Sequence, residues 1–184
     1  MPRPPEPPPT GAAAEDAEPE AYEVARSIAL RILEAAPRSR AQLAERLARR
    51  GVAPEVAERV LDRFTEVGLL DDAAYARMLV SSRRASKGLA PRALALELRR
   101  AGIDQETAAA ALAELAEEQS ESDAEVAARL VERRLRQMRG LAPEVASRRL
   151  VGMLARKGYP VGLATRVVRE MLQVELDSRE DGGE

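Results

Sequence analysis

The spacing Leu-x3-Leu-x3-Gly occurs three times in this chain of 184 residues, and an apolar residue follows the glycine each time. The three copies end at Gly51, Gly102 and Gly158. Leucines four residues apart lie on one face of an α-helix, and glycine readily adopts the left-handed conformation in which many helices end. The pattern therefore predicts one helical unit repeated three times. A unit of this size buries little core, so each copy is expected to lean on its neighbours.

Helix start signals lie around these endings at matching places. Pro54, Pro91 and Pro143 suit a first helical position, and Ser39 and Ser122 precede a Gln or Glu at capping-box spacing. No segment alternates between apolar and polar residues in the manner of a strand. We expect helices over residues 22–36, 40–50, 54–67, 72–87, 91–101, 105–118, 123–139, 143–157 and 161–175. Asp72 and Asp104 are the expected N-caps of two of them.

The predicted fold is all-α, a tandem array of three three-helix repeats, elongated and curved, with disordered acidic tails. Aromatic residues make up only 2% of the chain, which favours thin helical layers over a thick core. The Pro-rich N-terminus has too little apolar surface to order itself. The predicted bounds are 1–20 for the Pro-rich tail, 21–70, 71–118 and 119–176 for the repeats, and 177–184 for the second tail.

The composition argues against an enzyme. The chain contains no Cys and no His, which excludes Cys/His zinc sites, cysteine nucleophiles and histidine general bases. The Asp71-Asp72 pair has no third ligand nearby and directly precedes a helix, so capping is the preferred interpretation. We predict no catalytic residue, no cofactor and no metal. The N-terminus does not resemble a signal peptide and no apolar run approaches the roughly 20 residues that span a bilayer, so we expect a cytoplasmic protein, and a monomer.

Charge is segregated along the chain. Acidic residues dominate 1–20, 114–125 and 175–184, so the remaining helical body is strongly basic despite a net charge of −2. Few of its arginines have a Glu one turn earlier, and such rows can contact phosphates or an acidic protein surface. A plainer alternative is that these arginines only solvate helix faces. The candidate partner-binding residues are Arg77, Arg83, Arg84, Lys87, Arg92, Arg99, Arg100, Arg129, Arg133, Arg136, Arg149 and Arg156. On the fourth helix the side opposite the basic residues is expected to carry Tyr75, Met78, Leu79 and Ser82.

The run LLDDAAYARMLVSSRRASKGLAPRALALELRRAGI, at residues 69–103, resembles the signature of the RecX regulatory proteins, which modulate the bacterial RecA recombinase. The match lies in the Asp-rich start, an aromatic-Ala pair, an Arg, a basic-Gly-x-x-Pro turn and a Glu-Leu-basic-x-x-Gly-Ile ending. It extends to residues 39–51 and 150–160. Leu79 departs from the family, which often has a bulky aromatic there, and the acidic N-terminal tail is additional.

The resemblance implies a protein that binds the RecA–single-stranded-DNA filament and binds DNA weakly or through that filament. It would inhibit ATP hydrolysis, strand exchange and co-protease activity, and so modulate recombination, DNA repair and the SOS response. An alternative is a helical DNA-binding protein that acts without recombinase and binds DNA with steep salt dependence. Another is a scaffold that recruits partners through its Pro-rich tail. A helix-turn-helix in the first repeat would place Glu55, Glu58 and Asp62 against DNA, which disfavours that reading.

Overall fold

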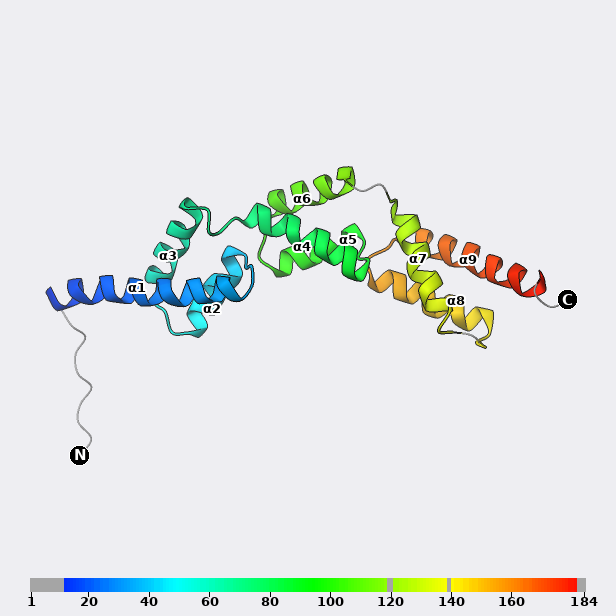
Figure 1. Cartoon of the computed structure of the whole chain (residues 1–184), viewed down its shortest axis with the longest axis horizontal. Coiled ribbons are helices and arrows are strands. Elements are labelled where there is room, and N and C mark those ends of the chain that lie inside the picture. Colours follow the sequence, from blue (N-terminus) through cyan, green and yellow to red (C-terminus); the bar gives the residue numbers. More distant parts are fainter. Residues whose placement is uncertain (1–11, 119–120, 139, 182–184) are drawn as a thin grey trace, which may run out of the picture. The chain divides into compact units, whose positions relative to one another are not determined.

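The structure, a computed structural model, describes residues 12–118, 121–138 and 140–181, with side chains over 19–118, 121–138 and 140–175. Within these ranges the chain forms nine α-helices and no strand (Figure 1). Their bounds are α1 Ala12–Ala35, α2 Arg40–Arg49, α3 Pro54–Glu66, α4 Asp72–Lys87, α5 Pro91–Arg100, α6 Gln105–Glu118, α7 Asp123–Leu135, α8 Pro143–Arg156 and α9 Val161–Asp181. The predicted all-α fold of helical repeats is confirmed.

The three Leu-x3-Leu-x3-Gly segments end their helices in the same way. Gly51, Gly102 and Gly158 all have positive φ. The N–H of the apolar residue after each glycine donates to the carbonyl of the second leucine, at 3.2 Å for Val52 to Leu47 and 3.1 Å in the other two copies. This bond and the bond from the glycine N–H form a Schellman motif, which satisfies carbonyls left over at a helix end. The prediction of a left-handed ending at each glycine is confirmed.

Three predicted N-terminal caps are also present, at Ser39, Asp104 and Ser122. Ser122 and Glu125 form both halves of a capping box at the start of α7. The Ser39 hydroxyl accepts from the Gln42 N–H at 3.2 Å, and Asp104 accepts from the Thr107 N–H at 2.9 Å. These bonds satisfy N–H groups that have no partner within their helices.

Three helix bounds differ from the sequence prediction by four residues or more. α1 begins at Ala12, inside the segment expected to be a tail, and includes Pro19. The first residues of α1 are rich in Ala, which has high helix propensity. The prediction of a tail gave more importance to the prolines that precede them. α9 likewise continues to Asp181. Residues 1–11 and 182–184 of the predicted tails lie outside the described residues.

α7 ends at Leu135 although a helix was expected as far as residue 139. The N–H groups of Gln137 and Met138 donate to carbonyls only three residues back, at 3.1 and 2.8 Å, so the chain has already left the α-helical pattern. Gly140 has positive φ and belongs to the following turn.

The chain divides into two compact units, Met1–Tyr75 and Ala76–Glu184. In the first unit, α1 and α2 pack against α3 around a core that includes Leu43, Leu47 and Phe64. In the second unit, α7, α8 and α9 pack together around Leu150 and Leu154, and α5 packs against α6. Each core is thus centred on the repeated leucines, as their spacing predicts.

Equivalent positions in the three repeats have equivalent burial. Val60, Ala111 and Val167 each lie nine residues after the helix-ending glycine, and all three are buried. The middle copy has the smallest of these side chains, and Leu112 and Leu115 beside it are only partly buried. The second repeat therefore has a thinner core than its neighbours in sequence.

Candidate partner-binding surface

Arg84 is buried in the second unit, with only 8% of its surface exposed. Its guanidinium donates to the carboxylate of Asp123 at 2.5 Å and to the carbonyl of Leu89 at 3.1 Å, and it lies 3.5 Å from the Tyr159 hydroxyl. These partners come from α7, from the α4–α5 loop and from the α8–α9 turn. Arg84 therefore ties the second repeat to the third. It is withdrawn from the surface on which the sequence analysis placed it.

The α4–α5 loop is held through its backbone. Three consecutive carbonyls, at residues 87, 88 and 89, accept from the Lys157 ammonium, the Tyr159 hydroxyl and Arg84 respectively. The loop also donates, since the Ala90 N–H bonds the Lys157 carbonyl at 2.9 Å. We call this set of contacts the repeat 2–3 junction. Burial raises the pKa of the Tyr159 hydroxyl, which keeps it protonated as a donor to Gly88.

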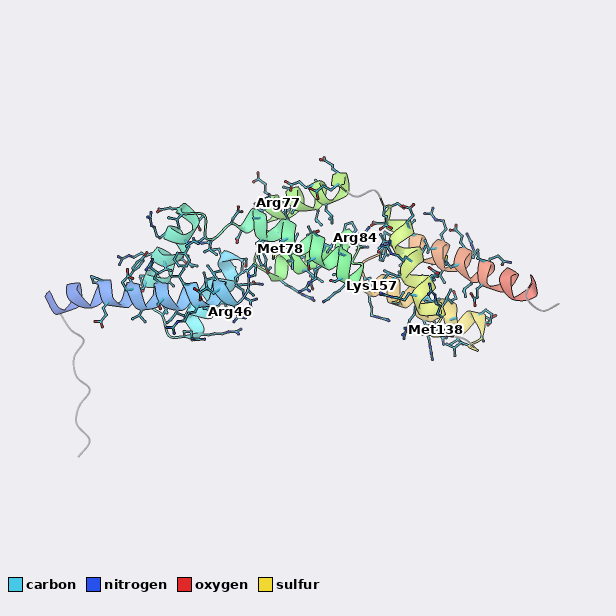
Figure 2. All side chains as sticks on the ribbon, in the orientation of Figure 1. Arg46, Arg77, Met78, Arg84, Met138 and Lys157 are labelled. Carbon is cyan, nitrogen blue, oxygen red and sulfur yellow. The ribbon has the colours of Figure 1, made fainter. Side chains whose placement is uncertain are left out.

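Close packing accompanies these bonds. Ala90 belongs to the buried core of the third repeat although it precedes α5. A Cβ at Gly158 would lie 2.6 Å from the backbone nitrogen of Ala93, and a Cβ at Gly88 would lie 2.8 Å from a methyl of Leu130. Both glycines therefore allow the two repeats to approach more closely than any other residue would. Figure 2 labels Arg84, on α4, and Lys157, directly after α8.

The start of α4 belongs to the first unit and explains another part of the sequence motif. Asp71 caps the helix by accepting from the Ala74 N–H at 2.8 Å, a role that the sequence analysis gave to Asp72. Asp72 instead accepts from the backbone N–H of Arg40 at 2.8 Å, and the Tyr75 hydroxyl donates to the Gln42 side chain at 3.1 Å. Both contacts hold the start of α2. The acidic pair is structural, as predicted, but Asp71 is the N-cap and Asp72 bonds the start of α2.

The buried face of α4 consists of Ala76, Val80 and Arg84, which are four residues apart. Of the side expected opposite the basic residues, Tyr75 and Leu79 are partly buried, whereas Met78 is 43% exposed (Figure 2). A basic residue, Arg84, thus belongs to the buried face of this helix.

Half of the twelve candidate residues have carboxylate partners. Besides Arg84, these residues are Arg77 with Glu114 at 3.7 Å, Arg83 with Glu97 at 3.4 Å, Arg100 with Glu97 at 3.4 Å, Arg136 with Glu132 at 2.7 Å, and Arg129 with Glu121. Some partners come from another helix and some from one turn away. The arginines were expected to lack carboxylate partners, and this expectation holds for only part of the set.

The other six are exposed, and among the residues with described side chains none of them pairs with a carboxylate. These six are Lys87, Arg92, Arg99, Arg133, Arg149 and Arg156. We call them the open cations. They lie on α4, α5, α7 and α8, all within the second unit. Arg92 and Arg99 are seven residues apart on α5, as are Arg149 and Arg156 on α8, so each pair shares a helix face.

Lys157 was missed by the sequence analysis. It is only partly exposed, directly after α8, and its ammonium donates to the Lys87 carbonyl seventy positions earlier. Burial lowers the pKa of Lys157, and the positive charges of Arg133 and Lys87 lower it further. Lys157 directly follows Arg156 in the sequence, but only the junction reveals that it lies beside two candidate cations of other helices.

Other kinds of site find no support in the part of the chain that the structure covers. No group of three or more Asp, Glu, Cys or His side chains there is placed to hold a metal ion. No helix there has the length and apolar character needed to cross a membrane.

Comparison with known proteins identifies the repeats. Residues 25–64, 71–112 and 121–168 match the models of the first, second and third three-helix domains of RecX. A regulatory protein RecX from Thermobifida fusca is 52% identical over 168 residues, which cover 91% of this chain and 88% of the relative. Another from Streptomyces coelicolor is 49% identical over 162 residues, covering 88% of this chain and 85% of the relative.

Solved structures agree on the fold. A crystal structure of RecX from Lactobacillus salivarius has a TM-score of 0.69 at 18% identity and covers 83% of this chain and 97% of its own. A crystal structure of a regulatory protein RecX has a TM-score of 0.71 at 24% identity, covering 88% of this chain and 75% of its own. The three domain matches and the two close relatives show that this chain belongs to the RecX family of regulatory proteins.

Proposed function

We propose that this protein binds the RecA–single-stranded-DNA filament through the open cations and inhibits the recombinase activities of that filament. These activities are ATP hydrolysis, strand exchange and co-protease function, so the protein modulates recombination, DNA repair and the SOS response. It has no catalytic step of its own in this proposal. Membership of a family of regulatory proteins supports the regulatory role.

The observation that carries the proposal is that six exposed cations without carboxylate partners among the described side chains lie on four helices of one compact unit. Exposed Arg and Lys side chains without carboxylate partners are available to phosphates and to acidic protein surfaces. The repeat 2–3 junction fixes the cations of α4 and α5 relative to those of α7 and α8. Several weak contacts that are held together engage as a set, and their combined affinity then exceeds that of any one contact by orders of magnitude.

The test is DNA-stimulated ATP hydrolysis by RecA during titration with this protein. Reversing two open cations together, Arg92→Glu with Arg99→Glu, should raise the concentration needed for half-inhibition by about tenfold or more, since each lost charge-assisted contact weakens binding. The matched control is Arg166→Glu with Arg169→Glu, two exposed residues of α9 in the same unit. It makes the same charge change and should leave inhibition near the wild-type level.

Equal loss of inhibition in both double variants would contradict the proposed surface, because net charge alone would then explain the effect. A DNA-binding assay without RecA accompanies the titration. Tight, steeply salt-dependent DNA binding by a protein that does not inhibit RecA would instead support the DNA-binding alternative.

A further inference from the structure

The chain contains only two lysines, and the fold places both at one point. The sequence uses Arg at every other basic position, with Lys only at 87 and 157. Lys87 is the last residue of α4, and Lys157 follows the last residue of α8. The Lys157 ammonium donates to the Lys87 carbonyl, so two residues from different repeats meet within the second unit.

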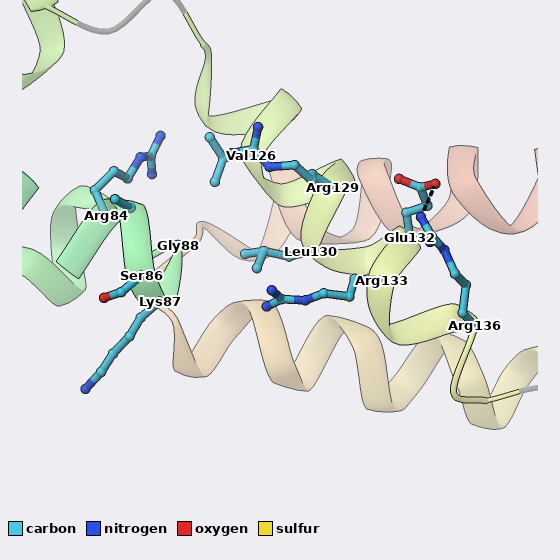
Figure 3. Close-up of a pocket in the computed structure, with 11 residues that line it drawn as sticks. Arg84, Ser86, Lys87, Gly88, Val126, Arg129, Leu130, Glu132, Arg133 and Arg136 are labelled. Atoms are coloured by element: carbon cyan, nitrogen blue, oxygen red, sulfur yellow. Dashed lines mark hydrogen bonds and ion pairs between the residues drawn. The ribbon is translucent and has the colours of Figure 1, made fainter. Parts of the chain in front are cut away.

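Arg133 of α7 is the third cation at this point. Figure 3 shows its side chain reaching from α7 toward the end of α4, where Lys87 lies. Arg133 and Lys87 are near enough to Lys157 for their charges to disfavour its protonated form. Among the described side chains, none of the three has a carboxylate partner. Glu132, which adjoins Arg133 in the sequence, is bound to Arg136.

The surface is hollowed on both sides of Arg133. One hollow, of about 270 Å³, is lined by residues that include Lys87, Gly88, Leu130 and Arg133. The other, of about 280 Å³, is lined by Leu130, Arg133, Arg134, Gln137, Met153 and Lys157. Arg133 and Leu130 line both hollows, whereas Lys87 lines only the first and Lys157 only the second. Arg133 is therefore common to two adjacent hollows, each of which also has a lysine. Each hollow has room for a small anion.

We propose that Lys87, Arg133 and Lys157 form a phosphate-binding site, and that its occupant is a backbone phosphate of single-stranded DNA. Three like charges without a counter-ion repel one another, and a bound anion removes that cost. A phosphate in either hollow can accept from Arg133 and from the lysine of that hollow. Its oxygens point in tetrahedral directions and suit donors from different helices, whereas a carboxylate offers two oxygens in one plane. Arg supplies a forked donor and the lysines supply compact charges.

The assignment of the phosphate to DNA rests on the proposed function, whereas the phosphate-binding site itself does not depend on it. Arg134 and Arg136 lie beside the hollows, on the same helix as Arg133. A polyanion with regularly spaced phosphates would meet these residues after occupying the site, whereas a free phosphate ion would not.

The two-lysine composition makes the site directly observable. With side-chain isotope labelling, an NMR spectrum has only two lysine signals, and each can be followed through a pH titration in chloride buffer. Adding oligothymidylate should raise the pKa of Lys157, because a bound phosphate stabilises the ammonium. Arg133→Ala should abolish this response and weaken oligonucleotide binding several-fold, with the log–log salt slope reduced by about 0.7 for the one lost contact. Arg169→Ala removes one exposed charge elsewhere in the unit and should change neither.

A Lys157 titration that oligothymidylate does not shift would overturn the site, even if the protein inhibits RecA. A shift without any RecA inhibition would support the site and overturn the proposed function. Two further probes identify the ligand. A response to inorganic phosphate but not to the oligonucleotide would retain the phosphate chemistry and overturn DNA as its source. A response to polyglutamate alone would overturn the phosphate assignment.

Discussion

Arg83 and Arg84 are adjacent in sequence and differ in almost everything else. Arg83 is partly exposed beside Glu97, whereas Arg84 is buried among Leu89, Asp123 and Tyr159. No local pattern predicts this difference, since the partners of Arg84 lie five, 39 and 75 positions away. The sequence analysis could find basic residues and their helix faces, but it could not tell which of them the tertiary packing would bury.

The substitution Arg84→Ala should lower the free energy of unfolding of the second unit by about 3 kcal/mol, because it leaves a carbonyl and a hydroxyl short of a partner and Asp123 without its counter-charge. Arg83→Ala is the matched control and should cost less than about 1 kcal/mol, since exposed ion pairs contribute little. Urea denaturation followed by circular dichroism measures both. Similar losses for the two variants would show that Arg84 does not hold the junction.

At the scale of helices and turns, most of the fold could be predicted from the sequence. The Schellman endings and the capping residues act within a few positions, so their spacing fixes where α2, α5 and α8 end. The start of α1 was placed too late because the Pro-rich segment before it indicated a tail, and the end of α7 was placed four residues too late. The candidate surface was predictable only as a set of basic faces. Its division into paired and open cations depends partly on contacts between helices, such as those of Arg77 with Glu114 and of Arg83 with Glu97.

Two of the helix-ending glycines provide a matched comparison. Gly51→Ala introduces a Cβ at positive φ into open space and should cost about 1–2 kcal/mol. Gly158→Ala has the same backbone strain and also forces the Cβ against Ala93, which should add about 1–3 kcal/mol.

Thermal unfolding of the two glycine variants measures the difference in cost. Hydrogen exchange at the Ala90 amide, which bonds the Lys157 carbonyl, reports on the junction itself and should accelerate only in Gly158→Ala. Equal effects of the two substitutions would contradict a close approach of the second repeat to Gly158.

At the scale of the whole molecule, two buried cores share no residue. One is built on Leu43, Leu47 and Phe64, and the other on Leu150, Leu154 and Ala90. The second repeat contributes Ala90 to the core of the third and has a thin core of its own. The second and third repeats are therefore joined by packing as well as by hydrogen bonds.

Separate cores predict separable losses of stability. Leu47→Ala and Leu154→Ala each remove a fully buried side chain and should cost about 3 kcal/mol or more. Leu47→Ala should increase amide exchange mainly within residues 19–75, and Leu154→Ala mainly within residues 76–175. Hydrogen exchange with mass spectrometry resolves the two ranges. An increase across both ranges in either variant would mean that the units unfold as one.

The α4–α5 loop meets the third repeat through three carbonyls and one N–H of its main chain. A main-chain group is the same whatever side chain its residue carries. The identity of Leu89, the partly buried residue between Gly88 and Ala90, is thus free to drift over evolutionary time while the path of the backbone is kept. Selection should instead act on Arg84, Lys157 and Tyr159, whose side chains donate hydrogen bonds to the loop carbonyls. It should also keep the small residues that allow the backbone to come close.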